Sequence, residues 1–212
     1  MVADAALATD WTLIGFLDDD PHAAVGRTVV AGALSSTPPH LGSLEDALDV
    51  LRDLESHGRL GGWIAALGGL ELRQTVIDRL ERGSDALRRR AATVVHPSAW
   101  VSAAATIGQG VWVGPTAVIH TRANVHAHAI VNSGAIVEHE CRVGPNTHLA
   151  PGSVLGGRVE IGEGSLIGLG ARVLPNVKVG SGCTIGAGAT VTRDVPDGAT
   201  VMGTPARSRR DP

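Results

Sequence analysis

Every sixth residue from Val95 to Val191 is valine, isoleucine or leucine, without a single change of register. A helix repeats its buried face every 3.6 residues and a simple strand every second residue, so neither explains a period of six. Such a period is typical of a hexapeptide solenoid, in which short strands wind around a prism with one aliphatic residue per wall. With three walls per coil, every third hexad stacks, and the repeats predict about 25–29 Å of prism at a strand spacing of ~4.8 Å.

The other positions of the hexad also follow a pattern. The residue four places after each aliphatic is mostly small, so we expect it to share the interior. The residue directly after the aliphatic is often glycine, and we expect it to form the corners because glycine tolerates positive φ. Cys141 and Cys183 fall on interior positions of different walls, so we expect two free buried thiols and a reducing, cytoplasmic compartment.

Residues 1–94 follow a different rhythm, in which apolar strand-like runs alternate with amphipathic helices. Ser43 can cap a helix together with Asp46, and Gly58 can end it. The alternation predicts a small α/β domain with a parallel sheet. The expected strands span residues 11–17, 63–67 and 91–95, and the expected helices span 43–57 and 71–81. We expect a solenoid over residues 95–195 and a C-terminal cap and tail over 196–212, because the last coil would otherwise expose an unpaired edge.

Composition excludes some classes of function. The formal net charge of −3 argues against a nucleic-acid partner bound through bulk positive charge. No apolar run approaches the ~20 residues of a membrane span and no signal peptide is visible, so we expect a soluble protein without a membrane partner. The basic run at residues 88–90 is interpreted as a solvated helix end or linker.

Residues 137–141, Val-Glu-His-Glu-Cys, depart from the glycine- and alanine-rich sequence around them. A carboxylate that accepts a hydrogen bond from one imidazole nitrogen selects the tautomer and leaves the other nitrogen as a proton acceptor. His139 with Glu140, or with Glu138, can therefore act as a general base. The residues alone leave open that these three side chains form an ordinary exposed surface.

Three segments resemble one family. GFLDDDP, the later WIAALGGLELRQTVIDRL, and VEHEC followed by HLAPG are similar to the bacterial sialic-acid O-acetyltransferases and UDP-4-amino-sugar N-acetyltransferases. The resemblance implies a truncated Rossmann-like domain that binds a sugar nucleotide, followed by a left-handed parallel β-helix. It also implies acetyl-CoA as co-substrate and a homotrimer with active sites between neighbouring prisms.

The resemblance also assigns roles to residues. His139 is the base and Glu140 the acid that tunes it, with Glu138 as a competitor for that role. His148 contacts the thioester, and because it lies half a coil from His139, a neighbouring subunit must bring the two together. Leu169, Gly186 and Ala187 line the pantetheine arm, and Asp18, Asp19, Gly68 and Asn132 are the candidates for substrate binding. Residues 201–207 resemble the family's cap, and Arg207, Arg209 and Arg210 are candidates for the 3′-phosphate of CoA.

The chain departs from the family at its start, where the first strand and a G-x-G-G-H-G loop are missing. Either the start is truncated or the nucleotide site is degenerate, and an inactive homologue is one alternative. A zinc enzyme like the γ-carbonic anhydrases is another, but His120, His126 and His128 do not aim at one point. We therefore expect no metal and interpret these three as corner or surface residues. The sugar, the choice between N- and O-acetylation and the acyl length stay open.

Overall fold

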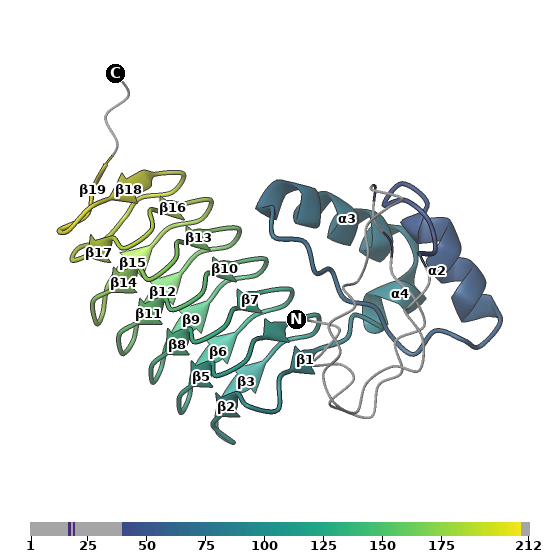
Figure 1. The fold of residues 1–212 in the computed structure, drawn as a ribbon, viewed down its shortest axis with the longest axis horizontal. Coiled ribbons are helices and arrows are strands. Elements are labelled where there is room, and N and C mark those ends of the chain that lie inside the picture. Colours follow the sequence, from purple (N-terminus) through teal and green to yellow (C-terminus); the bar gives the residue numbers. More distant parts are fainter. Residues whose placement is uncertain (1–16, 18, 20–39, 209–212) are drawn as a thin grey trace.

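The hexads build a parallel β-solenoid, seen side-on in Figure 1. The computed structural model describes Leu17, Asp19 and residues 40–208. Each hexad contributes one strand of two residues, and the second residue of each strand is the periodic aliphatic. The strands are β1 (Val94–Val95), β2 (Trp100–Val101), β3 (Thr106–Ile107), β4 (Trp112–Val113), β5 (Val118–Ile119), β6 (Asn124–Val125), β7 (Ile130–Val131), β8 (Ile136–Val137), β9 (Arg142–Val143), β10 (His148–Leu149), β11 (Val154–Leu155), β12 (Glu160–Ile161), β13 (Leu166–Ile167), β14 (Arg172–Val173), β15 (Lys178–Val179), β16 (Thr184–Ile185) and β17 (Thr190–Val191).

Strands three apart in the sequence pair in parallel, so the solenoid has three walls. The first wall contains β1, β4, β7, β10, β13 and β16, the second contains β2, β5, β8, β11, β14 and β17, and the third contains β3, β6, β9, β12 and β15. Val95 pairs with Val113, and the same step of three hexads relates Val137 to Leu155. The stacking predicted from the sequence is confirmed.

The interior has the composition that the hexad predicts. The aliphatic residues from Val113 to Leu155 are fully buried, and so are the small residues between them, such as Ala129 and Ala135. Burial of one valine, leucine or isoleucine side chain contributes about 1.5–3 kcal/mol, so this continuous column stabilises the prism along its length. Cys141 and Cys183 are buried free thiols, as expected. Burial raises the pKa of the Cys141 thiol to about 11.

The sequence predicted that glycine follows the aliphatic residues because it tolerates positive φ, and this reason was wrong. The glycines directly after the aliphatic residues do not have positive φ. A Cβ at Gly108, Gly114 or Gly144 would instead lie 2.6–2.8 Å from a backbone nitrogen of the next coil. Close stacking of coils therefore selects these glycines. Positive φ occurs two residues later, at every sixth position from Gly110 to Gly188. Glycine fills only half of these left-handed corners, and the others hold Thr116, Arg122, His128, Glu140, Asn146, Arg158 and Asn176.

The described part of residues 1–94 is mainly helical: α2 (Ala47–Ser56), α3 (Leu70–Gly83) and α4 (Asp85–Arg89). The Oγ of Ser43 accepts a hydrogen bond from the backbone N–H of Asp46 at 3.3 Å, and the carboxylate of Asp46 accepts one from the backbone N–H of Ser43 at 3.2 Å, as the predicted cap requires. The two residues form a turn before α2, however, and α2 begins at Ala47. Helix α3 agrees with the predicted helix and buries Ile77 and Leu80. Helix α4 ends in Arg88 and Arg89, which confirms the basic run as a helix end.

The parallel sheet expected in this part is only partly present. The expected strand at 63–67 is reduced to one parallel bridge between Trp63 and Ala91, and the expected strand at 91–95 begins only at Val94. The indole of Trp63 is held by a 2.7 Å hydrogen bond to the carbonyl of Leu87 and packs into a small core with α2 and α3. The candidate strand at 11–17 lies outside the described residues except for Leu17, which packs against this core.

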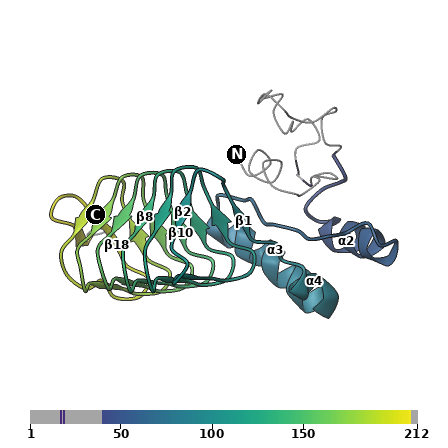
Figure 2. The same cartoon turned by 90° about the horizontal axis from the view of Figure 1, so that it is seen from below.

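The helical part is joined to the first coils of the solenoid (Figure 2). Arg73 of α3 is fully buried, and its guanidinium donates to the Oδ1 of Asn146 at 2.6 Å and to the carbonyl of Leu67 at 3.0 Å. Burial lowers the pKa of Arg73 to about 10. The Nε2 of His128 is 2.7 Å from Glu81, and its ring stacks on Trp63 at 5.7 Å. His128 is thus a corner residue, as expected, but it is buried in this joint and not on the surface.

The far end of the solenoid is covered by a hairpin, β18 (Thr200–Met202) and β19 (Arg207–Ser208). Between them, Ala206 is buried against the last coil, and its backbone N–H donates to the carbonyl of Thr190 at 2.8 Å. This agrees with the cap predicted from the sequence. Among the residues that the structure describes, no helix is both long and apolar enough to cross a membrane.

Candidate functional site

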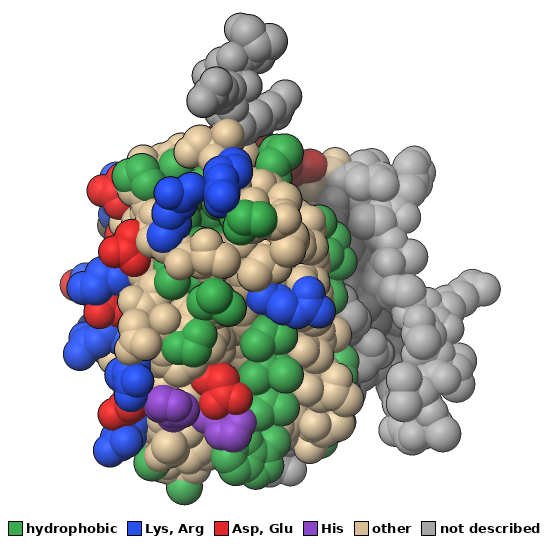
Figure 3. Space-filling model, turned by 90° about the vertical axis from the view of Figure 1, so that its left-hand side faces the viewer, with side chains coloured by type: hydrophobic (Ala, Val, Ile, Leu, Met, Phe, Trp, Pro, Cys, Tyr) green, Lys and Arg blue, Asp and Glu red, His purple; other side chains and the backbone are tan. Residues whose placement is uncertain are grey.

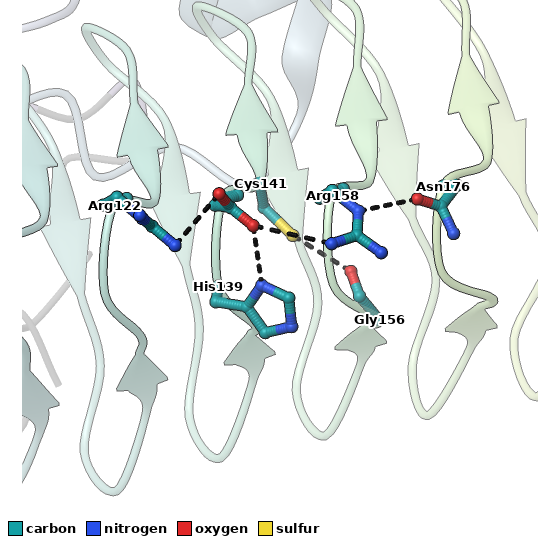
Figure 4. Close-up of polar contacts among 7 residues, drawn as sticks. Arg122, His139, Cys141, Gly156, Arg158 and Asn176 are labelled. Atoms are coloured by element: carbon teal, nitrogen blue, oxygen red, sulfur yellow. Dashed lines mark hydrogen bonds and ion pairs between the residues drawn. The ribbon is translucent and has the colours of Figure 1, made fainter.

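His139 lies on the corner between the second and third walls, after β8. The side chain is half exposed, and its Nδ1 is 3.1 Å from the Oε2 of Glu140 (Figure 4). When Nδ1 donates to this carboxylate, Nε2 is left as the nitrogen that can accept a proton. The hydrogen bond from His139 holds the pKa of Glu140 below its usual value, and the charges of Arg122 and Arg158 act in the same direction. Glu140 is therefore an ionised partner for the ring.

Glu138 points to a different partner. Its Oε1 is 3.8 Å from the Nε2 of His120, whose ring lies 5.2 Å from that of Trp100. Of the two acids that flank His139, only Glu140 forms the contact that a general base needs. The structure thus separates two carboxylates that the sequence left as competitors.

Gly157 supports the ring of His139 from the next coil. A Cβ on Gly157 would lie 2.5 Å from the Nε2 and 2.7 Å from the Cε1 of His139. The ring occupies the space that any other residue would fill. Sequence reasoning missed this glycine, although it stands one coil after His139 and the stacking of coils would have placed it beside the ring.

His148 brings a second group of candidates together on the first wall. Its Nε2 is 3.2 Å from the Nδ2 of Asn132. Burial lowers the pKa of His148, the charge of Arg73 adds to this effect, and a contact with the backbone of Gly68 opposes it. His148, Asn132 and Gly68, three candidates from separate parts of the sequence, are therefore neighbours. The neutral imidazole is the favoured form here.

The candidates for the pantetheine arm follow the edge between the first and second walls. Leu169 is 60% exposed, and its carbonyl accepts a hydrogen bond from Gly188 on the next coil. Ala187 stands one coil after Leu169. Gly186 cannot carry a side chain, because its Cβ would lie 2.9 Å from that of Met202. This edge also includes Asn132, whereas His139 lies on a different edge of the same prism.

The remaining candidates either form hydrogen bonds with nearby backbone or lie outside the residues that the structure describes. Asp19 accepts a hydrogen bond from the backbone N–H of Leu44 at 2.9 Å. Arg207 is exposed, and its guanidinium donates to the carbonyl of Ala206. Asp18, Arg209 and Arg210 lie outside the described residues. Among the residues that are described, no group of three or more His, Cys, Asp or Glu side chains could hold a metal ion.

A groove of about 580 Å³ runs along the third wall and is lined by residues such as Arg142, Glu160 and Lys178. None of the candidate catalytic, cofactor-binding or substrate-binding residues lines it, whereas His126, considered above as a metal ligand, does. His139, His148 and the edge with Leu169 are instead spread over the outside of one prism.

Comparison with known proteins identifies the family of this chain. Residues 158–193 match the family model described as bacterial transferase hexapeptide (six repeats). The acetyltransferase domain of PglB from Neisseria gonorrhoeae is 33% identical, with a TM-score of 0.81, over 98% of this chain and 93% of that chain. PerB from Caulobacter crescentus, solved in complex with CoA and GDP-perosamine, is 32% identical with a TM-score of 0.76 over 92% of this chain and 84% of that chain. The chain belongs to the bacterial hexapeptide-repeat sugar acetyltransferase family.

A further solved structure is similar at lower identity. WeeI from Acinetobacter baumannii is 26% identical, with a TM-score of 0.64, over 68% of both chains. A search by sequence among curated proteins found no match. The resemblance read from the residues is therefore confirmed at the level of the family.

The sequence pointed to His139, Glu140 and His148 but not to Arg122, Arg158 or Arg73. Arg122 and Arg158 stand one coil before and one coil after Glu140, so the stacking period was the signal that could have found them. No such signal exists for Arg73, whose partner Asn146 is 73 residues away in the sequence.

Proposed function

We propose that this protein transfers an acetyl group from acetyl-CoA to the amine, or a hydroxyl, of a nucleotide-activated amino sugar or sialic acid. The observation that carries the proposal is the pair formed by His139 Nδ1 and Glu140 Oε2 at 3.1 Å, on an exposed corner. Two findings on relatives support it: PerB was solved with CoA and GDP-perosamine, and the PglB domain was solved with acetyl coenzyme A.

In the proposed reaction, the sugar nitrogen attacks the thioester carbonyl carbon while Nε2 of His139 takes its proton. Glu140 stabilises the imidazolium that forms. The tetrahedral intermediate collapses with cleavage of the carbon–sulfur bond, and the imidazolium returns the proton to the leaving thiolate. The products are the N-acetyl sugar and CoA, and no acyl-enzyme is needed because both substrates meet in one cleft. The same steps apply to a hydroxyl nucleophile.

We propose that the cleft lies between subunits of a homotrimer of left-handed prisms. Outward side chains on the second wall support this. Strand pairing places Trp100, Val118, Ile136 and Val154 next to one another in an apolar strip, and Trp100 is 53% exposed. Hydrophobic side chains gather on the face of the prism that Figure 3 shows. A surface of this kind marks an interaction site. With His139 on one edge of the prism and His148 on another wall, a neighbouring subunit would bring a second histidine to each base.

Within this cleft, His148 would face the thioester, and Leu169, Gly186 and Ala187 would lie along the pantetheine arm. Residues 1–94 would form the domain that binds the sugar nucleotide, with Asp18, Asp19, Gly68 and Asn132 as candidates. The contact between His148, Asn132 and the backbone of Gly68 supports this placement, because it joins the helical part to the proposed acetyl site.

The test is a thiol-release assay with acetyl-CoA across UDP-, dTDP- and GDP-linked amino sugars and sialic acid. We expect one class to be acetylated, and His139→Ala to lower kcat by about 10²–10⁴ while CoA binding persists. The matched control is His126→Ala, on another edge, which should keep the wild-type rate. An unchanged rate for His139→Ala would remove this residue from the mechanism, and a lack of thiol release with every acceptor would contradict the function.

A further inference from the structure

Four long side chains form a ladder along the edge that carries His139. Arg122, Glu140, Arg158 and Asn176 follow one another at intervals of one coil, so each stands above the last on neighbouring coils (Figure 4). The guanidinium of Arg122 is 3.0 Å from the Oε1 of Glu140, and that of Arg158 is 3.7 Å from its Oε2. The Nε of Arg158 donates to the Oδ1 of Asn176 at 2.7 Å. We call these four residues the corner ladder.

The backbone of the corner ladder is in a conformation that suits glycine. Its φ values lie between 57° and 63°, the left-handed region, which costs free energy for a side chain such as arginine or glutamate. On the edge between the first and second walls, the same position holds Thr116 and then glycine at 134, 152, 170 and 188. A run of four non-glycine residues on one edge therefore indicates that their side chains have a function.

The third edge shows the same rule. Its left-handed positions are Gly110, Gly164 and Gly182, except where His128 and Asn146 bind the helical part. There, non-glycine residues stand where their side chains make a specific contact. On the edge of His139, Arg122 and Arg158 make their specific contacts with Glu140.

The geometry of Glu140 shows what the ladder does. Arg122 occupies Oε1 at 3.0 Å, which leaves Oε2 toward the Nδ1 of His139 at 3.1 Å. Arg158 closes the other side and is itself held by Asn176. The remaining charged group on this corner, Glu138, is directed to His120 and does not compete for these arginines.

We propose that Arg122 and Arg158 are positioning residues for acetyl transfer, which hold the carboxylate of Glu140 in the one orientation that aligns the ring of His139. The proposal rests on the function proposed above. Neither arginine needs to touch the substrate, because both act through Glu140.

The test uses glycine, which removes the side chain and relieves the backbone at the same time. The double variant Arg122→Gly/Arg158→Gly should lower kcat about tenfold, the size of effect typical of groups that orient a functional side chain. The KM for acetyl-CoA should stay within about twofold. Thr116→Gly is the matched control for stability, because its φ is also 57° and its corner lies on a different edge from His139. The double variant should melt no lower than this control.

A cycle with Glu140→Gln separates positioning from direct binding. If the arginines act through the carboxylate, their removal in the Glu140→Gln background should leave kcat unchanged, because the group they orient is gone. A further tenfold loss in that background, or a rise in KM with constant kcat, would show that they bind substrate directly and would overturn the proposal. A kcat of the double variant equal to that of the wild type would also overturn it.

A readout that does not need activity distinguishes this proposal from the function itself. Nitrogen-15 spectra of the histidine rings, with His139 assigned by its loss in His139→Ala, report which ring nitrogen carries the proton. We expect the Nδ1–H form to dominate in the wild type and to give way to a mixture in the double variant. Unchanged ring shifts would overturn the ladder, whereas a wild type that is inactive with every sugar but shows these shifts would overturn only the function.

Discussion

Substitution of Gly157 by alanine should disable His139 without unfolding the protein. The new Cβ would lie 2.5 Å from the Nε2 of His139, whereas ordinary contacts begin at 3.4 Å. The difference is 0.9 Å (3.4 − 2.5), so the ring must move by about this distance. A displacement of that size lengthens the 3.1 Å contact with Glu140 beyond hydrogen-bond range. Because a misplacement of about 1 Å costs about 10²-fold in rate, kcat should fall by this factor.

The backbone gives no reason for a loss of stability. Alanine already occupies the equivalent corner position at Ala103, Ala127 and Ala187. Replacement of glycine at a compatible position stabilises a protein by about 0.4–1 kcal/mol. The assay compares kcat from thiol release with the free energy of unfolding in urea. A variant with wild-type kcat, or one that loses activity only because it unfolds, would refute the proposed arrangement of the ring.

Three further predictions follow from the joint and from the second wall. Arg73→Met should lower the free energy of unfolding by at least about 2 kcal/mol, because it leaves the buried acceptors on Asn146 unpaired; urea denaturation measures this, and no loss would mean that the joint contributes little. Folding lowers the pKa of His148 from its ordinary value of 6.5. Near and below pH 6.5 this histidine therefore binds more protons in the unfolded chain than in the folded one, so the free energy of unfolding should fall as the pH drops from 7 toward 5. His148→Gln should flatten this dependence in denaturation curves taken at several pH values, and an equal slope would contradict it. Trp100→Glu should convert the proposed trimer to monomers in sedimentation velocity, with an unchanged circular dichroism spectrum; a persistent trimer would exclude the second wall as its interface.

The solenoid could be predicted from the sequence because its physics is local and periodic. Each wall accepts one aliphatic side chain per coil, so Val95 to Val191 repeat the same constraint at every step. The reason for the glycines could not be predicted in the same way. A frequent glycine indicates that a side chain is excluded, but it does not say whether torsion or close stacking excludes it. At Gly108 and Gly144 the neighbouring coil is the cause.

The helical part shows the opposite case. Helix α3 was predicted because its apolar residues follow the helical period, whereas the strand expected at 63–67 is a single bridge at Trp63. A run of apolar residues indicates burial but not pairing, and the indole here is buried through its bond to the carbonyl of Leu87. Tertiary context decided this segment.

In the candidate site as well, contacts between sequence neighbours could be predicted and contacts between distant residues could not. His139 and Glu140 are adjacent in sequence, so their contact could be predicted from a short motif. Arg122 and Arg158 became visible only when the coils were stacked, and the contact of Arg73 with Asn146 depends on how two separate parts of the chain meet.

The fixed length of the coil also determines which insertions this protein can accept. A single inserted residue would turn every later hexad by one position and direct polar side chains into the core. A whole coil added after Val191 would leave His139, its carboxylate, the edge proposed for the pantetheine arm and the joint with the helical part unchanged, and would only extend the prism toward its cap. The same coil added between His148 and Leu169 would move the edge proposed for the pantetheine arm away from His148 by about 4.8 Å, so the reach of that arm sets the number of coils between them.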